Sequence, residues 1–174
     1  MNVADFDALT PDAAGALLLD CLHGQAWADA VVAGRPYGDF DALATAAAAH
    51  WREADEAQRL EAFAAHPRIG DVELLRARYS RANVEQGQVL SAPEAVITRL
   101  KALNDAYFDR FGFIFIICAS GRSAEEMLAA IEARVDNDRT TELDNAAAEQ
   151  GKIMLLRLRD RFADATPGRE EDRS

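Results

Sequence analysis

The sequence predicts an all-α fold, a single-domain bundle of about seven to nine helices with one short extended segment around residues 113–118. Apolar residues make up 49% of the chain and aromatic residues only 7%, and alanine supplies much of the apolar share, which favours closely packed helices. The 174 residues suffice for one substantial core, so we expect one domain over residues 1–163. The polar stretch 164–174 is predicted to be a disordered tail.

Capping residues mark the helix starts in the first part of the chain. Thr10 followed by Pro11 has the order of an N-cap and a first-turn proline. Asp39 or Asp41 can cap the alanine-rich run that follows. The helices predicted here cover about residues 11–22, about residues 25–33 and the run through Trp51.

A further helix is predicted to end at His66. Its apolar residues at helical spacing are Ala54, Ala57, Leu60 and Ala64. Pro67 explains the end, because proline disfavours the helical region for the residue before it. His66 is therefore expected at a helix terminus.

The second half of the chain continues the helical pattern. Helices are predicted over about residues 72–79, 83–90, 93–111 and 141–162. The third of them ends at Gly112 and carries one apolar stripe, formed by Val96, Leu100, Leu103 and Tyr107. Residues 113–118 are rich in β-branched and aromatic side chains but have no strand partner. Ser123 and Glu126 then predict a capping box for a helix that carries Met127, Leu128, Ile131 and Val135.

Charge and motifs exclude several classes of function. The formal net charge of -11 disfavours nucleic acid and anionic membranes as partners, although a local arginine can still bind a small anion. Cys21 and Cys118 form neither a CxxC pair nor a zinc spacing, so we expect both to be reduced. The three histidines lack metal-site spacing, and no P-loop, GxGxxG or GxSxG motif occurs. Acid–base chemistry remains, and no metal is expected.

The start of the chain predicts a cytoplasmic location. No Lys or Arg precedes Arg35, and acidic residues interrupt the early apolar runs, so we expect no secretory signal. No stretch approaches the length of a transmembrane helix.

His66 and Arg157 are the first candidates for a site. An imidazole at a helix end can exchange protons near neutral pH, and the alternative is that His66 simply precedes a helix stop. Arg157 shares a face of the last helix with Leu143, Ala146, Gln150 and Ile153, which predicts that it points inward. An arginine in that position is expected either to bind an anion or to pair with a carboxylate at the edge of the core. Arg159 lies on nearly the opposite side and is expected to be solvated.

Two further segments can contribute polar groups. Glu85 and Gln86 form an acid–amide doublet that can orient an imidazole and bind a urea group, and the alternative is surface decoration. Residues 115–119 either plug the core or offer buried backbone groups to a ligand that carries amides.

The chain resembles the 2-oxo-4-hydroxy-4-carboxy-5-ureidoimidazoline (OHCU) decarboxylase family, up to about Phe162. The motifs that carry the resemblance are His66-Pro67-Arg68-Ile69-Gly70, Glu85-Gln86, Arg110-Phe111-Gly112-Phe113, Phe115 to Ala119, the helix start at Gly121 to Met127, and Leu156-Arg157-Leu158. Each motif is short, but they occur in order and at spacings like those of the family.

The resemblance implies an all-helical enzyme that forms (S)-allantoin in urate breakdown, as a homodimer and without metal or organic cofactor. His66 matches the catalytic proton donor, and Glu85 and Arg157 are counted with it as catalytic residues. The positions counted as substrate-binding are Pro67, Ala82, Asn83, Val84, Gln86, Phe115, Ile116, Ile117, Cys118 and Ala119. The backbone of the last five matches the stretch that receives the ring and ureido groups.

One position departs from the family pattern. The family commonly carries a serine three residues before the glutamate, where this chain has Ala82, and the loop before Glu85 is shorter than in many relatives. Either Ser80 or Asn83 replaces the hydroxyl, or one substrate hydrogen bond is absent. Two alternatives to the decarboxylase stay open: an inactive relative that binds a ureide, which Ala82 and the shorter loop would explain, and a helical interaction protein that uses its acidic surface.

Overall fold

The structure, a computed structural model, describes residues 1–66 and 94–162. Within these ranges the regular elements are all helices, so the predicted all-α class is confirmed. The helices are α1 (Val3–Asp7), α2 (Pro11–Cys21), α3 (Gln25–Ala33), α4 (Phe40–Arg52), α5 (Glu56–Ala64), α7 (Glu94–Phe111), α8 (Ala124–Arg134) and α9 (Arg139–Phe162). None of these helices is long and apolar enough to cross a membrane. The helices predicted at 72–79 and 83–90 and the tail at 164–174 lie outside the described residues.

Contacts divide the chain into two compact units. Unit 1 comprises Met1–Ala62 and the chain from Gly151 onward, and unit 2 comprises Phe63–Gln150. The single-domain organisation expected from the chain length stays a prediction.

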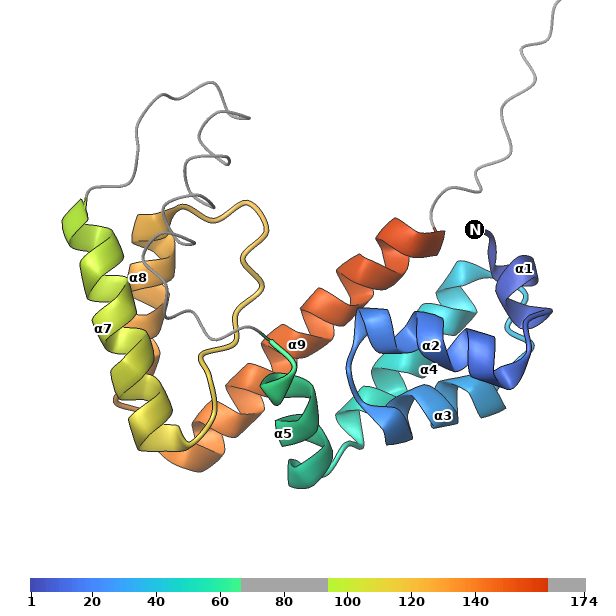
Figure 1. Cartoon of the computed structure of the whole chain (residues 1–174), viewed down its shortest axis with the longest axis horizontal. Helices are drawn as coiled ribbons and strands as arrows, with labels where there is room; N and C mark the ends of the chain where they lie inside the picture. Colours follow the sequence, from blue (N-terminus) through green and yellow to red (C-terminus); the bar gives the residue numbers. More distant parts are fainter. Residues whose placement is uncertain (67–93, 163–174) are drawn as a thin grey trace, which may run out of the picture. The chain divides into compact units, whose positions relative to one another are not determined.

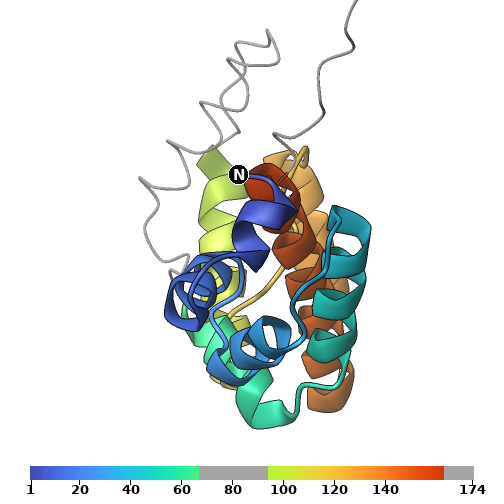
Figure 2. The same ribbon diagram turned by 90° about the vertical axis from the view of Figure 1, so that its right-hand side faces the viewer.

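Unit 1 is organised by the caps that the sequence predicts. The Thr10 hydroxyl accepts a hydrogen bond from the Ala13 amide at 3.3 Å, and Pro11 is the first residue of α2. The Asp39 carboxylate accepts from the Ala42 amide at 2.8 Å, so Asp39 rather than Asp41 caps α4. Helix α2 packs against α3, and α3 against α4 (Figure 1 and Figure 2).

The short helix α1 is an element that the sequence patterns above do not predict. Its five residues are too few to show a helical period. Asn2 and Asp5 form a reciprocal capping box, in which each side chain accepts from the other residue's amide. Phe6 is fully buried and meets Phe162 edge to face, with ring centroids 5.3 Å apart. Capping and one buried aromatic ring therefore hold this turn.

Unit 2 is built around α7 and α8, which pack side by side and point the same way (Figure 1). The 18 residues of α7 span about 27 Å. A chain that must return over that length in few residues has to be extended, which explains why residues 114–119 form neither helix nor strand. Gly112, at φ +78°, ends α7 as expected. The capping box of Ser123 and Glu126 starts α8, also as expected.

The buried stripe of α7 differs from the prediction at one position. Leu100, Leu103 and Tyr107 are buried, but Val96 is only half-buried and Ile97 is buried instead. The buried residues of the central row recur at intervals of three and four, at Ile97, Leu100, Asn104, Tyr107 and Phe111. Val96 lies at the edge of this row.

Candidate active site

His66 lies in the turn that follows α5, two residues beyond the helix end at Ala64. Its backbone amide donates to the Phe63 carbonyl at 3.2 Å, which continues the last turn of the helix. The ring is half-buried, and its Nε2 lies 2.5 Å from Oε1 of Gln150. The predicted location of His66 at a helix terminus is confirmed, and its proposed role as an acid stays a prediction.

Gln150 is a polar residue on a buried face of α9. Its side chain is 1% exposed, and Ala146 and Met154, one turn before and one turn after it, are fully buried. The sequence places Gln150 on the apolar face of this helix but does not single it out as a site residue. The sequence signal that could have identified Gln150 is an amide at a position where the helical pattern favours an apolar side chain. Burying an amide costs free energy unless the amide is hydrogen-bonded.

The predicted ligand-binding stretch 115–119 is part core and part surface. The side chains of Phe115 and Ile116 are 4% and 2% exposed, as the core-plug alternative predicts, whereas residues 117–119 are half-buried. The Cys118 amide donates to Oε2 of Glu149 at 2.8 Å, and the Cys118 carbonyl accepts from Nε of Arg122 at 3.1 Å.

These contacts reduce the number of backbone groups in this stretch that a ligand could bind. Side chains of the protein already satisfy both groups of Cys118 and the carbonyl of Ile116. Within the described part of the chain, the N–H and C=O of Ile117 have no hydrogen-bond partner. Because Glu149 and Gln150 are neighbours on α9, one turn of that helix holds both the stretch and His66.

A buried ion pair lies behind the same stretch. Arg134 donates from Nε and Nη2 to Glu142 Oε2, both at 2.9 Å, and from Nη1 to the Ile116 carbonyl at 2.9 Å. Its guanidinium carbon is 4.5 Å from the centroid of the Phe115 ring. Arg134 thus fixes both the backbone and the side chain of the stretch at its buried end.

Glu142 is fully buried, and four residues donate hydrogen bonds to its carboxylate. Besides Arg134, its donors are the Tyr107 hydroxyl at 2.5 Å, Asn137 at 2.9 Å and Asn145 at 2.8 Å. Burial alone raises the pKa of Glu142, but these hydrogen bonds outweigh it and hold the pKa below its ordinary value. Burial, and then the bond to Glu142, raise the pKa of Tyr107. Both groups keep fixed protonation states near neutral pH, so this cluster is a support and not a proton-transfer group.

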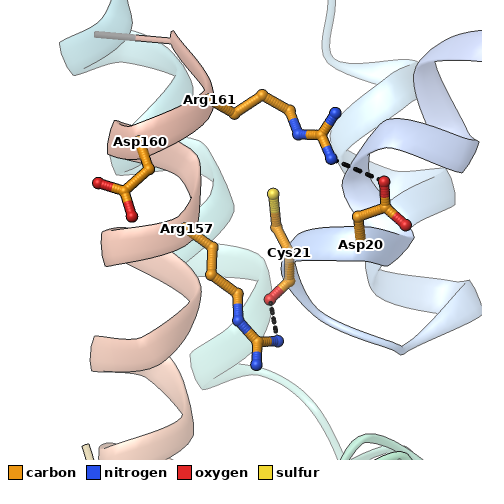
Figure 3. A pocket seen from close by; sticks show the side chains of 5 residues that line it. All are labelled: Asp20, Cys21, Arg157, Asp160 and Arg161. Carbon is orange, nitrogen blue, oxygen red and sulfur yellow. Dashed lines mark hydrogen bonds and ion pairs between the residues drawn. The ribbon is translucent and has the colours of Figure 1, made fainter. Parts of the chain in front are cut away.

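Arg157 lines a surface pocket of about 480 Å³ in unit 1, together with Asp20, Cys21, Asp160 and Arg161 (Figure 3). Its Nη1 donates to the carbonyl of Cys21, the last residue of α2, at 3.2 Å. Arg161 is ion-paired with Asp20 at 2.7 Å. In the described part of the chain, the neutral Cys21 carbonyl is the one partner of Arg157, so its guanidinium has donors to spare for an anion.

The prediction that Arg157 points inward was wrong. Leu143, Ala146 and Gln150 on its predicted face are buried, but Arg157 itself is exposed. The buried row drifts around α9 and passes through Met154, Leu158 and Phe162 at its end. Arg157 lies about a quarter of a turn from Leu158, at the edge of that row. Arg159 is exposed, as predicted.

Reactive cysteines and metal-binding groups are two other kinds of chemistry that the described residues could offer. Both cysteines are free, as expected, and burial raises the pKa of the Cys21 thiol, so it stays protonated near neutral pH. Among the described residues, no group of three or more His, Cys, Asp or Glu side chains is placed to hold a metal ion. The other predicted site residues, Pro67, Ala82, Asn83, Val84, Glu85 and Gln86, lie outside the described residues.

Comparison with known proteins decides the family. A family model described as OHCU decarboxylase matches residues 7–159. The chain belongs to the OHCU decarboxylase family. The resemblance inferred from the motifs is thereby confirmed.

Two relatives and one solved structure are similar to this chain over most of its length. A 2-oxo-4-hydroxy-4-carboxy-5-ureidoimidazoline decarboxylase of Haloferax volcanii is 31% identical, with 74% of this chain and 76% of the relative covered. The uric acid degradation bifunctional protein TTL of Arabidopsis thaliana is 36% identical over 83% of this chain, which spans 46% of that protein's length. A crystal structure of OHCU decarboxylase in the presence of (S)-allantoin matches with a TM-score of 0.69 and 32% identity, covering 84% of this chain and 96% of that one.

Proposed function

We propose that the chain decarboxylates 2-oxo-4-hydroxy-4-carboxy-5-ureidoimidazoline to (S)-allantoin in urate breakdown, without a cofactor. The observation that carries the proposal is the family match over residues 7–159, which includes both His66 and Arg157. The crystal structure similar to this chain was obtained with (S)-allantoin, the product of the proposed reaction.

His66 is the proposed proton donor. When the bond between the ring carbon and the carboxylate breaks, carbon dioxide leaves and the electron pair passes into the bond to the neighbouring ring carbon, which bears the ureido group, giving an enolate-like species. Protonation of that ureido-bearing carbon, with loss of the hydroxyl proton from the carbon that carried the carboxylate, completes the product. Delivery from a single imidazole on one side of the ring gives one enantiomer, and we assign Glu85 to orient His66.

Arg157 is the proposed anchor for the negative charge of the substrate and of the developing intermediate. Its position on a pocket and its spare donors support this role, whereas the neighbouring Arg161 is already paired with Asp20. The backbone of residues 115–119 is proposed to receive the ring and ureido groups, with Pro67, Ala82, Asn83, Val84 and Gln86 as further contacts. The open amide and carbonyl of Ile117 support this assignment.

A turnover assay tests the proposal directly. Freshly generated substrate is added to the protein, and circular dichroism follows the appearance of allantoin. We expect (S)-allantoin to form at a rate far above the spontaneous one. Spontaneous rates with a thermal shift on adding allantoin would instead indicate an inactive ureide-binding relative, and the absence of both would favour an interaction protein.

We also propose a homodimer and a cytoplasmic location. The dimer rests on the family resemblance, and the location is supported by the two free cysteines. Light scattering behind a sizing column should give about twice the 19.0 kDa mass of the chain, and a monomer at micromolar concentration would contradict the dimer.

A further inference from the structure

We propose that Gln150 is a positioning residue that fixes the ring of His66 and makes Nδ1 the nitrogen that exchanges its proton. The inference rests on the proposed role of His66 and adds a residue that neither the motifs nor the comparisons single out. It is carried by the contact between Nε2 of His66 and Oε1 of Gln150, 2.5 Å apart.

The chemistry of the two groups determines the direction of this hydrogen bond. An amide oxygen only accepts, so the ring nitrogen that faces it must carry a hydrogen. The neutral imidazole has one N–H, which places it on Nε2 and leaves Nδ1 as the acceptor. A second proton therefore arrives at Nδ1 and leaves from Nδ1. The substrate can therefore exchange a proton with the ring only through that atom.

The surroundings of Gln150 explain why the contact holds the ring firmly. The amide is 1% exposed, and its neighbours on the same face of α9, Ala146 and Met154, are fully buried. A buried amide oxygen without a donor would cost free energy, so rotating His66 away from Gln150 is unfavourable. The adjacent Glu149 binds the Cys118 amide at 2.8 Å, so the same turn of α9 fixes the backbone stretch proposed to receive the substrate.

The first test compares two volume-conserving variants on α9. Gln150→Met removes the acceptor but keeps the length of the side chain, and Leu143→Met is the matched control on the same buried face. We expect Gln150→Met to lower kcat by about 10- to 100-fold, the equivalent of one buried hydrogen bond, with little change in KM. Gln150→Glu retains an oxygen acceptor and should restore most of kcat at its own pH optimum. Equal kcat for Gln150→Met and wild type would overturn the proposal.

The second test is independent of turnover. Nitrogen-15 NMR of the histidine rings distinguishes the two neutral tautomers of His66 in the full-length protein. We expect the Nε2–H form in the wild type and a mixture of tautomers in Gln150→Met. A wild-type His66 with its hydrogen on Nδ1 would overturn the inference. If the wild type failed to turn over substrate, the proposed function would fall, while this measurement would still decide the role of Gln150.

Discussion

Glu142 is the one fully buried carboxylate among the described residues, and it keeps its charge because its donors surround it. Its folded-state pKa is depressed below the ordinary 4.5 by hydrogen bonds that outweigh burial. A depressed carboxyl pKa contributes stability above the ordinary value, and this contribution is lost as the pH falls through the folded value. The free energy of unfolding of unit 2 should therefore fall as the pH drops below about 4.5, because Glu142 then becomes protonated when the chain unfolds.

Replacing Glu142 with Gln tests the contribution of that charge. The change leaves Arg134, whose side chain is 13% exposed, without its carboxylate, so we expect a loss of about 3–5 kcal/mol in the free energy of unfolding at pH 7. The variant should also show a flatter dependence of stability on pH between 7 and 3. Urea unfolding at several pH values measures both effects.

The matched control is Glu132→Gln. Glu132 is also paired with an arginine, Arg99, but both side chains are about half exposed, at 47% and 58%. The Glu132→Gln variant should lose less than about 1 kcal/mol in the free energy of unfolding. If the two variants lost equal stability, burial would not be what gives the Glu142 pair its strength.

Arg157 and Arg159 provide a comparison two residues apart on one exposed helix end. Arg157→Ala should lower kcat/KM by about 100- to 1000-fold, because it removes the donor proposed to bind developing negative charge. Arg159→Ala should stay within about twofold of the wild type, since Arg159 lines no described pocket. Steady-state kinetics of both variants measure the difference, and similar losses would contradict the anchoring role.

At the scale of elements, the stretch 115–119 shows how an extended segment is held without a strand partner. Arg134 binds its buried end at the Ile116 carbonyl, and Glu149 and Arg122 bind Cys118. The supporting side chains come from α8, α9 and the loop before α8. The shape of the stretch is therefore set by side chains from helices that are themselves well capped.

Glu149→Ala tests whether this support matters for binding. The Cys118 amide would lose its acceptor, and the proposed receiving stretch would loosen, so we expect KM to rise by about tenfold with a smaller change in kcat. Glu125→Ala, an exposed carboxylate in the first turn of α8, is the control and should leave KM unchanged. A KM unaffected by Glu149→Ala would contradict a role of this stretch in substrate binding.

Local signals predicted most of the described elements. Thr10-Pro11, Asp39 and the Ser123–Glu126 pair start helices where capping chemistry places them, and Gly112 ends one. Helix α1 was missed because its five residues show no period, although Asn2 and Asp5 already had the spacing of a capping box. Short elements held by tertiary burial leave little pattern in the sequence.

The site was less predictable than the elements. The sequence placed Gln150 on a buried face but could not show that its amide meets His66, which is 84 positions away. The same holds for Arg134, Glu142 and Glu149, whose partners lie on other elements. Arg157 was misjudged because a fixed angle per residue, applied over many turns, misses the drift of the buried row around a long helix.

At the scale of the whole molecule, the residues for which roles are proposed come from both compact units. His66, Gln150 and the stretch 115–119 belong to unit 2, and Arg157 belongs to unit 1. The net charge of -11 gives no general attraction for an anionic substrate, so local cations must supply it. The proposed reaction thus depends on a few placed groups and not on the overall field.

The stereochemistry of the product formed by His66→Asn tests the central claim most directly. The variant should keep the far-ultraviolet dichroism of the helical fold but yield allantoin slowly and without an enantiomeric excess, because protons from solvent reach both faces of the ring. Formation of (S)-allantoin by His66→Asn at the wild-type rate would contradict the assignment of His66 as the proton donor.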